Sequence, residues 1–210
     1  MSNSQQDAPP EGHPTRQFHS PRDKKRLLET LAYKQAGHLL ELGFGHGGFL
    51  SLASRYFHIV GIDHSHKRVA EARAANDGRV YVKRADIETE DLGVKHFDVV
   101  AAFNILEHLH APHKTVDKVY RGLRDTGILI GSVPNNQPLL GKIHTELTNL
   151  GDPTHYSTYS PTHWQRIFDG AGFREIIFFG ELLFTKYVSL YIHNPFWRYY
   201  CYNLLFVCRK

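Results

Sequence analysis

Short apolar runs alternate with amphipathic segments through most of the chain. Seven runs have the length and composition of buried strands, at residues 38–42, 58–62, 79–83, 96–103, 124–135, 173–179 and 203–209. Between them, capping residues and apolar positions at helical spacing predict helices at residues 20–37, 49–55, 65–76 and 160–172. Strands that alternate with helices typically form a parallel sheet covered by helices, so the pattern predicts an α/β fold.

Two segments fall outside this alternation. Residues 1–18 contain almost nothing to bury and are expected to be disordered, which leaves residues 19–210 as a single domain. Residues 136–160 show no clear periodicity, and a loop of this length in a compact domain is usually functional.

Residues 180–202 form an aromatic-rich insertion between the last two predicted strands. Apolar residues at helical spacing occur in it, namely Leu183, Tyr187, Leu190 and Tyr191. Aromatic stripes are most often buried in a domain's own core, but they can also form a lid or docking surface for an apolar ligand, or a dimer interface. Charged residues within the insertion are compatible with contact at a membrane surface and exclude a spanning segment.

Composition narrows the class of protein without identifying it. The 210 residues are 41% hydrophobic and 22% charged, as in ordinary globular domains, and the net charge of +4 gives no sign of a nucleic-acid partner. The basic run at residues 22–26 is interpreted as a solvated helix face. Cys201 and Cys208 lie among apolar residues and are expected to be buried thiols.

Two expected absences follow from the same composition. The N-terminal residues lack the apolar stretch of a signal peptide and no apolar run is long enough to span a bilayer, so a cytoplasmic protein is expected. The 15 histidines occur without a local ligand motif such as H-E-x-x-H, so we expect no metal site. Nothing in the composition indicates an oligomeric state.

The sequence HLLELGFGHGG at residues 38–48 joins a predicted strand to a predicted helix through a glycine-rich turn. Glycines let the backbone approach a ligand closely, and the helix N-terminus lies beside them, so the turn is typical of a nucleotide-like cofactor site. Gly43, Gly45 and Gly48 also satisfy the dinucleotide pattern G-x-G-x-x-G. Glu41 suits a sulfonium ligand that carries an ammonium group better than it suits a pyrophosphate. The plainer alternative is a glycine-rich turn without a ligand.

Further carboxylates follow the next two strands. Asp63 ends the second strand 20 residues after Gly43, where a carboxylate can accept hydrogen bonds from ribose hydroxyls. It could instead only cap the helix that begins near Ser65. Asp86 and Ile87 come directly after the third strand, where a nicotinamide dinucleotide has no comparable need for an acidic residue.

In this order, the motifs resemble those of class I S-adenosylmethionine-dependent methyltransferases. Residues 97–109, FDVVAAFNILEHL, and the fifth-strand motif at 124–135 resemble the small-molecule branch that includes the ubiquinone and menaquinone enzymes. Asp125-Thr126-Gly127 departs from the usual Pro-Gly-Gly turn, and Phe44-Gly45-His46 from a common Cys-Gly-x. The resemblance implies a Rossmann-like sheet of seven strands, mostly parallel with an antiparallel last strand, and helices on both faces.

The resemblance also implies a cofactor, S-adenosyl-L-methionine, and the residues that bind it. The glycine loop would face the methionine end, Asp63 the ribose hydroxyls and Asp86 the adenine amino group, while the backbone of Ile87 would meet a ring nitrogen. The complete set of implied cofactor-binding residues is Glu41, Gly43, Phe44, Gly45, Gly47, Asp63, His64, Asp86, Ile87, Phe103 and Asn104.

The implied reaction is methyl transfer to a small or lipid-like acceptor, which we expect at an oxygen. A hydroxyl acceptor must lose its proton, and histidine suits that role near neutral pH. His108, just past the fourth strand, and His155, in the long loop, are the candidate catalytic bases. Either could instead only tie its segment to a neighbouring one.

Two alternatives stay open. RNA or protein methylation is one, although residues 104–107, NILE, replace the Asn/Asp-Pro-Pro-aromatic segment common in nucleic-acid amino-group methyltransferases. The other is a non-catalytic, cofactor-binding partner subunit of another enzyme. No implied cofactor residue is missing from the chain, which favours an enzyme.

Overall fold

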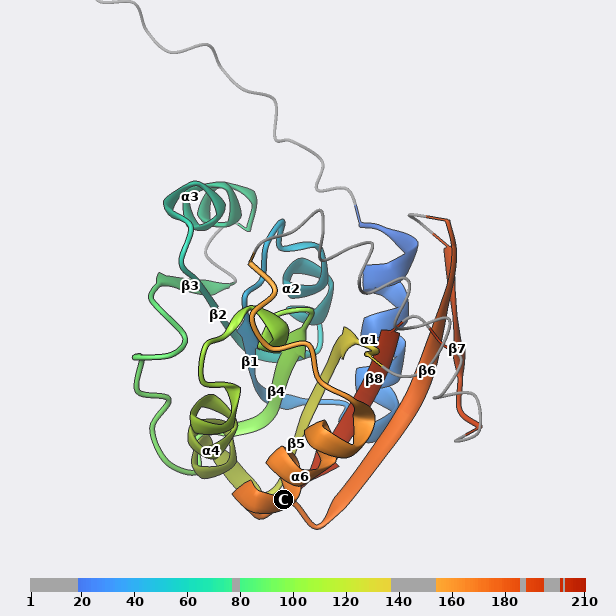
Figure 1. Ribbon diagram of the computed structural model, residues 1–210. Coiled ribbons are helices and arrows are strands. Elements are labelled where there is room, and N and C mark those ends of the chain that lie inside the picture. Colours follow the sequence, from blue (N-terminus) through green and yellow to red (C-terminus); the bar gives the residue numbers. More distant parts are fainter. Residues whose placement is uncertain (1–18, 77–79, 137–153, 186–187, 195–200, 202) are drawn as a thin grey trace, which may run out of the picture.

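The computed structural model describes residues 19–76, 80–136, 154–185, 188–194, 201 and 203–210 (Figure 1). Its strands are β1 Gly37–Leu42, β2 Phe57–Asp63, β3 Tyr81–Arg84, β4 Phe97–Phe103, β5 Leu123–Pro134, β6 Glu175–Thr185, β7 Val188–Ile192 and β8 Asn203–Arg209. Its helices are α1 Pro21–Tyr33, α2 Gly48–Ala53, α3 His66–Ala75, α4 Pro112–Gly122 and α6 Pro161–Ala171, with a 3₁₀ helix, η1, at Leu106–His108. The tail predicted at residues 1–18 lies outside the described residues.

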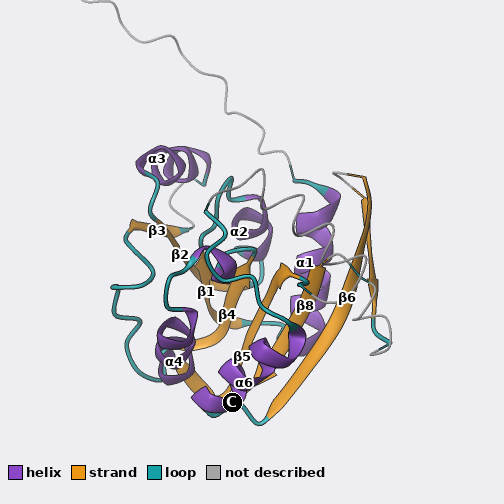
Figure 2. Ribbon diagram, viewed as in Figure 1, coloured by secondary structure: helices purple, strands orange, loops and turns teal. Residues whose placement is uncertain are grey.

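The described strands form one sheet in the order β3-β2-β1-β4-β5-β8-β6-β7. The first five strands in this order run parallel to one another. β8 lies antiparallel between β5 and β6, and β7 pairs antiparallel with β6 at the edge. Helices lie on both faces of the sheet (Figure 2). The predicted Rossmann-like α/β fold with an antiparallel last strand is confirmed.

Neighbouring residues of the central strands belong to opposite layers of the core. In β1, Leu39 packs in the layer that includes Phe49 of α2. Leu40, the next residue, packs in the layer that includes Trp164 and Phe168 of α6. Because both faces of β1 are covered, apolar residues are needed at successive positions, and this explains why the strand shows in the sequence as an apolar run.

The predicted number of strands was wrong by one, because residues 188–192 form β7 and the described part of the chain has an eight-stranded sheet. The helical spacing noted in the insertion does not correspond to a helix: β6 continues to Thr185, and Glu181 lies opposite Tyr191 of β7. Leu190 is exposed whereas Tyr191 is buried, as expected for the two-residue period of a strand. A few apolar residues in a short segment fit either period, and strand pairing decides between them.

One smaller difference follows β4. No helix was predicted at residues 112–122, where α4 begins with a proline in its first turn. The predicted cap of the first helix is confirmed: the Ser20 side chain accepts a hydrogen bond from the backbone N–H of Asp23. No helix in the described ranges is both long and apolar enough to cross a bilayer.

Candidate active site

The glycine loop between β1 and α2 has a backbone that side chains disfavour. Gly43, Gly45 and Gly47 have φ values of +64°, +52° and +71°, in the left-handed region. A Cβ atom at Gly43 would collide with Ile105, whereas one at Gly45 would meet no atom of the described residues within 4 Å. Gly45 is therefore required for its conformation, and the space beside it is open to a ligand.

Asp63, at the end of β2, holds the glycine loop in place. Its carboxylate is buried and accepts hydrogen bonds from the backbone N–H of Gly45 at 3.0 Å and of Ser65 at 2.9 Å. The side chain of Ser65 itself caps α3 by accepting from the N–H of Arg68. Asp63 thus connects the loop after β1 to the segment after β2, and helix capping is not its role.

The other residues predicted after β2 and β3 lie at the same edge of the sheet but do not line the cavity described below. His64 has a side chain that is 87% exposed, with Nδ1 3.7 Å from Asp63 Oδ1. Asp86 is exposed and accepts a hydrogen bond from the N–H of Glu88 at 2.8 Å, while the side chain of Ile87 is buried in the core. The backbone N–H of Ala85 bonds to the carbonyl of Asp63 at 3.2 Å, which fixes the position of this turn.

Glu41 presents a buried carboxylate to the cavity beside the glycine loop. Its side chain is 4% exposed, and Oε2 has no hydrogen-bond partner in the described part of the chain. Burial raises the pKa of Glu41 well above its ordinary value, although the guanidinium of Arg26 opposes that shift. A cationic ligand would stabilise the ionised form of this carboxylate, so Glu41 fits a ligand with an ammonium group.

A cavity of about 760 Å³ lies between the glycine loop and the start of α1. Predicted cofactor residues contribute Glu41, Gly43, Phe44, Gly45, Phe103 and Asn104 to its lining. The remaining lining residues, which were not predicted, are Ser20, Arg22, Asp23, Arg26, His46, Gly48 and Phe49. The volume is in the range of small-molecule sites. The predicted residues Gly47, Asp63, His64, Asp86 and Ile87 do not line it.

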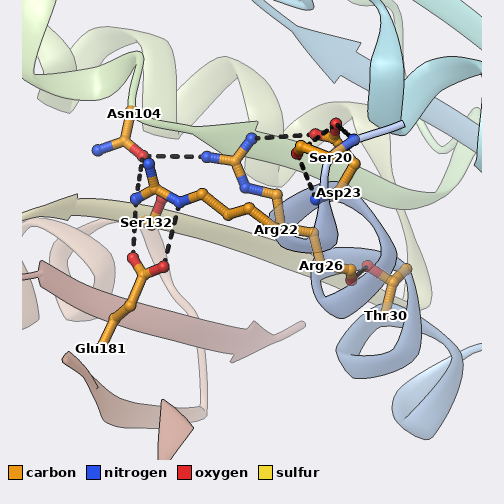
Figure 3. A network of polar contacts seen from close by, with 8 residues as sticks. All are labelled: Ser20, Arg22, Asp23, Arg26, Thr30, Asn104, Ser132 and Glu181. Carbon is orange, nitrogen blue, oxygen red and sulfur yellow. Dashed lines mark hydrogen bonds and ion pairs between the residues drawn. The ribbon is translucent and has the colours of Figure 1, made fainter. Parts of the chain in front are cut away.

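Two arginines of α1 turn toward the cavity, contrary to the prediction of a solvated basic face. Arg22 donates to both carboxylate oxygens of Glu181 in β6, with Nε–Oε1 at 3.1 Å and Nη2–Oε2 at 2.8 Å (Figure 3). Arg26 lies over the ring of Phe103, with 4.6 Å between the guanidinium carbon and the ring centroid. Only Lys24 of the run is exposed. The signal in the sequence was the four-residue spacing of the two arginines, which places them on one helix face.

Asn104 connects these arginines to Glu107 in η1. Its Oδ1 accepts hydrogen bonds from Arg26 at 3.1 Å and from Ser132 at 2.8 Å, and lies 3.4 Å from Arg22 Nη2 (Figure 3). Its Nδ2 donates to Glu107 Oε1 at 3.2 Å. With φ at +52°, Asn104 has a left-handed conformation that asparagine tolerates better than most residues.

Beyond Asn104 the structure brings together His108 and His155, the two predicted base candidates. Their rings pack edge to face with centroids 4.6 Å apart. His108 Nδ1 lies 3.1 Å from the carbonyl oxygen of Thr154 and 2.9 Å from its hydroxyl. Glu107 beside them is 1% exposed, and burial raises its pKa to about 7. Glu107 was not predicted as a site residue, because His155 and Ser157, which lie beside it, come from a distant segment.

Comparison with known proteins gives the family. Residues 16–176 match a family described as a methyltransferase domain. The chain belongs to this family. A probable S-adenosylmethionine-dependent methyltransferase of Mycolicibacterium smegmatis is 28% identical over an alignment of 162 residues that covers 71% of this chain. The methyltransferase domain described here spans 63% of that relative's length.

Solved methyltransferases share the fold. A Thermotoga maritima S-adenosylmethionine-dependent methyltransferase, described as a possible histamine N-methyltransferase, has a TM-score of 0.72 and 18% identity over 91% of this chain and 89% of its own. Phosphoethanolamine N-methyltransferase 2 of Haemonchus contortus, solved with S-adenosyl-L-methionine, has a TM-score of 0.63 and 19% identity over 74% of this chain and 38% of its own. The predicted class I S-adenosylmethionine-dependent methyltransferase domain is confirmed, with S-adenosyl-L-methionine as its cofactor. These matches do not distinguish the ubiquinone and menaquinone branch from others.

Proposed function

We propose that this methyltransferase domain transfers a methyl group to an oxygen of a small or lipid-like acceptor. The observation that carries the proposal is the pairing of His108 with His155, which Asn104 and Glu107 link to the cofactor cavity. S-adenosyl-L-methionine, when bound, supplies a methyl group already activated on sulfur. The chain's own contribution is then to bind, to orient and to accept a proton.

The residues around the cavity suit the methionine end of that cofactor. The unpartnered Oε2 of Glu41 would accept from the ammonium group, and Arg26 would pair with the carboxylate. The open side of Gly45 allows the ligand to approach the backbone. Asp63 would bind the ribose hydroxyls with the lone pairs that its two backbone hydrogen bonds leave free. Asp86, which is exposed after β3, would accept from the adenine amino group.

The hydrogen bonds of His108 suit it to accept a proton. In the tautomer that carries its hydrogen on Nδ1, His108 would donate to the carbonyl oxygen of Thr154 and would keep the lone pair on Nε2. As the acceptor oxygen forms its bond to the methyl carbon and the carbon–sulfur bond breaks, the hydroxyl proton would pass to His108 or to His155. A base of this kind contributes roughly 100- to 10,000-fold to the rate.

The proposal is tested by single-turnover assays of the purified chain with S-adenosyl-L-methionine and a panel of phenols and hydroxylated lipids. We expect His108→Ala or His155→Ala to lower the rate at least 100-fold while the affinity for S-adenosylhomocysteine stays within about threefold of the parent. Near-normal turnover in both variants would remove the base role. Methylation of RNA or protein, with no turnover on the small-molecule panel, would overturn the acceptor class.

A further inference from the structure

A carboxylate and two imidazoles meet at the acceptor side of the domain. Glu107, His108 and His155 each offer one ligand atom, and these atoms lie within 4.8 Å of one another. Glu107 is buried and the two histidines are half-buried. No local sequence motif reveals the group, because Thr154, the neighbour of His155, is 46 residues from His108 in the chain.

Backbone anchors hold the two segments together. The N–H of Ser157 donates to the carbonyl of Glu107 at 2.9 Å, and the Ser157 hydroxyl donates to the carbonyl of Leu109 at 2.8 Å. The hydrogen bond between His108 and Thr154 adds a third connection. Ser157 is 2% exposed, so these bonds are shielded from water. These bonds join residues 154–157 to residues 107–109, so the backbone itself places His155 beside Glu107 and His108.

Glu107 and His108, both in η1, each have an atom that could coordinate a cation. With its hydrogen on Nδ1, His108 would donate to the Thr154 carbonyl and would keep the lone pair of Nε2; metal-binding histidines in proteins are oriented by the same arrangement. Glu107 accepts from Asn104 through Oε1, but Oε2 has no hydrogen-bond partner among the described residues. A carboxylate oxygen that is buried and unpartnered is costly, and a cation beside it would offset that cost.

We propose that Glu107, His108 and His155 bind one divalent cation of the Zn²⁺ type. Two imidazoles and one carboxylate form a common ligand set of catalytic zinc sites, in which a further position stays open to water or substrate. The same set suits other first-row divalent cations. Ligand atoms around tetrahedral zinc are roughly 3.3 Å apart. The three ligand atoms here lie within 4.8 Å of one another, so small side-chain rotations would bring them to the spacing that zinc requires.

The cation would act at the site of the proposed methyl transfer, and this part of the inference rests on the proposed function. An acceptor hydroxyl bound at the open position would lose its proton to water more readily, because the cation stabilises the resulting oxyanion. The oxyanion would then attack the methyl carbon as the carbon–sulfur bond breaks. With a cation bound, His108 and His155 serve as ligands, and coordination replaces proton removal by either histidine.

Titration with the metal alone tests binding without reference to the acceptor. Untagged, chelator-treated chain would be titrated with ZnCl₂ by calorimetry and with CoCl₂ by visible absorption. We expect one saturable site with a dissociation constant in the micromolar range or below. Glu107→Gln and His155→Ala should each weaken it at least 30-fold, whereas His163→Ala, an exposed histidine stacked on Tyr159, should leave it unchanged.

The affinity of every variant for S-adenosylhomocysteine would show that its fold and cofactor cavity are intact. The proposal is overturned if the parent has no saturable site, or if Glu107→Gln and His155→Ala, both still binding S-adenosylhomocysteine, bind Zn²⁺ as tightly as the parent. The outcomes for the two proposals are separable. Stoichiometric Zn²⁺ binding in a chain that methylates no acceptor would contradict only the proposed function, and metal-independent methyl transfer without Zn²⁺ binding would contradict only the cation site.

Discussion

Replacing Arg22 with methionine is expected to destabilise the domain by about 2–3 kcal/mol. Arg22 donates to both carboxylate oxygens of Glu181, whose side chain is 1% exposed, and the change would leave that buried carboxylate without the guanidinium that pairs with it. Breaking a fully buried pair typically costs about 3–5 kcal/mol. The side chain of Arg22 is 26% exposed, so water can replace part of the lost interaction. The expected loss is therefore about 2–3 kcal/mol, below the range for a fully buried pair.

The assay is urea unfolding, supported by thermal melting, in which this loss corresponds to roughly 5–10 °C for a chain of this size. Lys24→Met on the same helix is the matched control, because Lys24 is exposed, and it should change stability by less than about 0.5 kcal/mol. The double variant Arg22→Met/Glu181→Leu should be more stable than Arg22→Met, because it removes the buried carboxylate together with the guanidinium that pairs with it. An Arg22→Met variant as stable as Lys24→Met would refute the argument.

Three further results are expected. Asp63→Ala should weaken S-adenosylhomocysteine binding in calorimetry by about 1–3 kcal/mol, because the glycine loop loses its anchor and the ribose its acceptor; an unchanged affinity would contradict this. Gly45→Ala should cost about 1–2 kcal/mol in urea unfolding, whereas Gly170→Ala in α6 should not destabilise, since a Cβ atom fits at both positions and only Gly45 has a positive φ. Burial raises the pKa of Cys201 to about 11 and that of Cys208 well above its ordinary value, so iodoacetamide at pH 7.5 should alkylate both thiols far more slowly in the folded chain than in urea; rapid labelling of the folded chain would refute their burial.

The parts of the site that could be predicted from the sequence are those encoded within a few residues. The glycine loop is one: its positive φ values require glycine, and it directly follows an apolar strand. Asp63 is another. Because β1 and β2 are parallel neighbours, both end at the same edge of the sheet, where the N–H of Gly43 donates to the carbonyl of Ile62, the residue before Asp63. In both cases local chain geometry places the group at the carboxyl edge of the parallel strands.

The rest depends on contacts between distant segments. Arg22 meets Glu181 across 159 residues, and nothing near either residue indicates the partner, so the basic run was taken for a solvated face. β7 exists because β6 offers it an edge, and the apolar spacing of its residues did not distinguish a strand from a helix. The group formed by Glu107, His108 and His155 likewise arises from the anchoring of Ser157, which no residue pattern records.

Mass spectrometry with S-adenosyl-L-methionine carrying a trideuterated methyl group shows whether this chain methylates an oxygen. The purified chain would be incubated with the labelled cofactor and the panel of phenols and hydroxylated lipids, and both products would be analysed. We expect S-adenosylhomocysteine in equal amount to an acceptor that carries the label on oxygen. Label on nitrogen or carbon, or no acceptor labelled anywhere in the panel by a chain that binds S-adenosylhomocysteine, would contradict it.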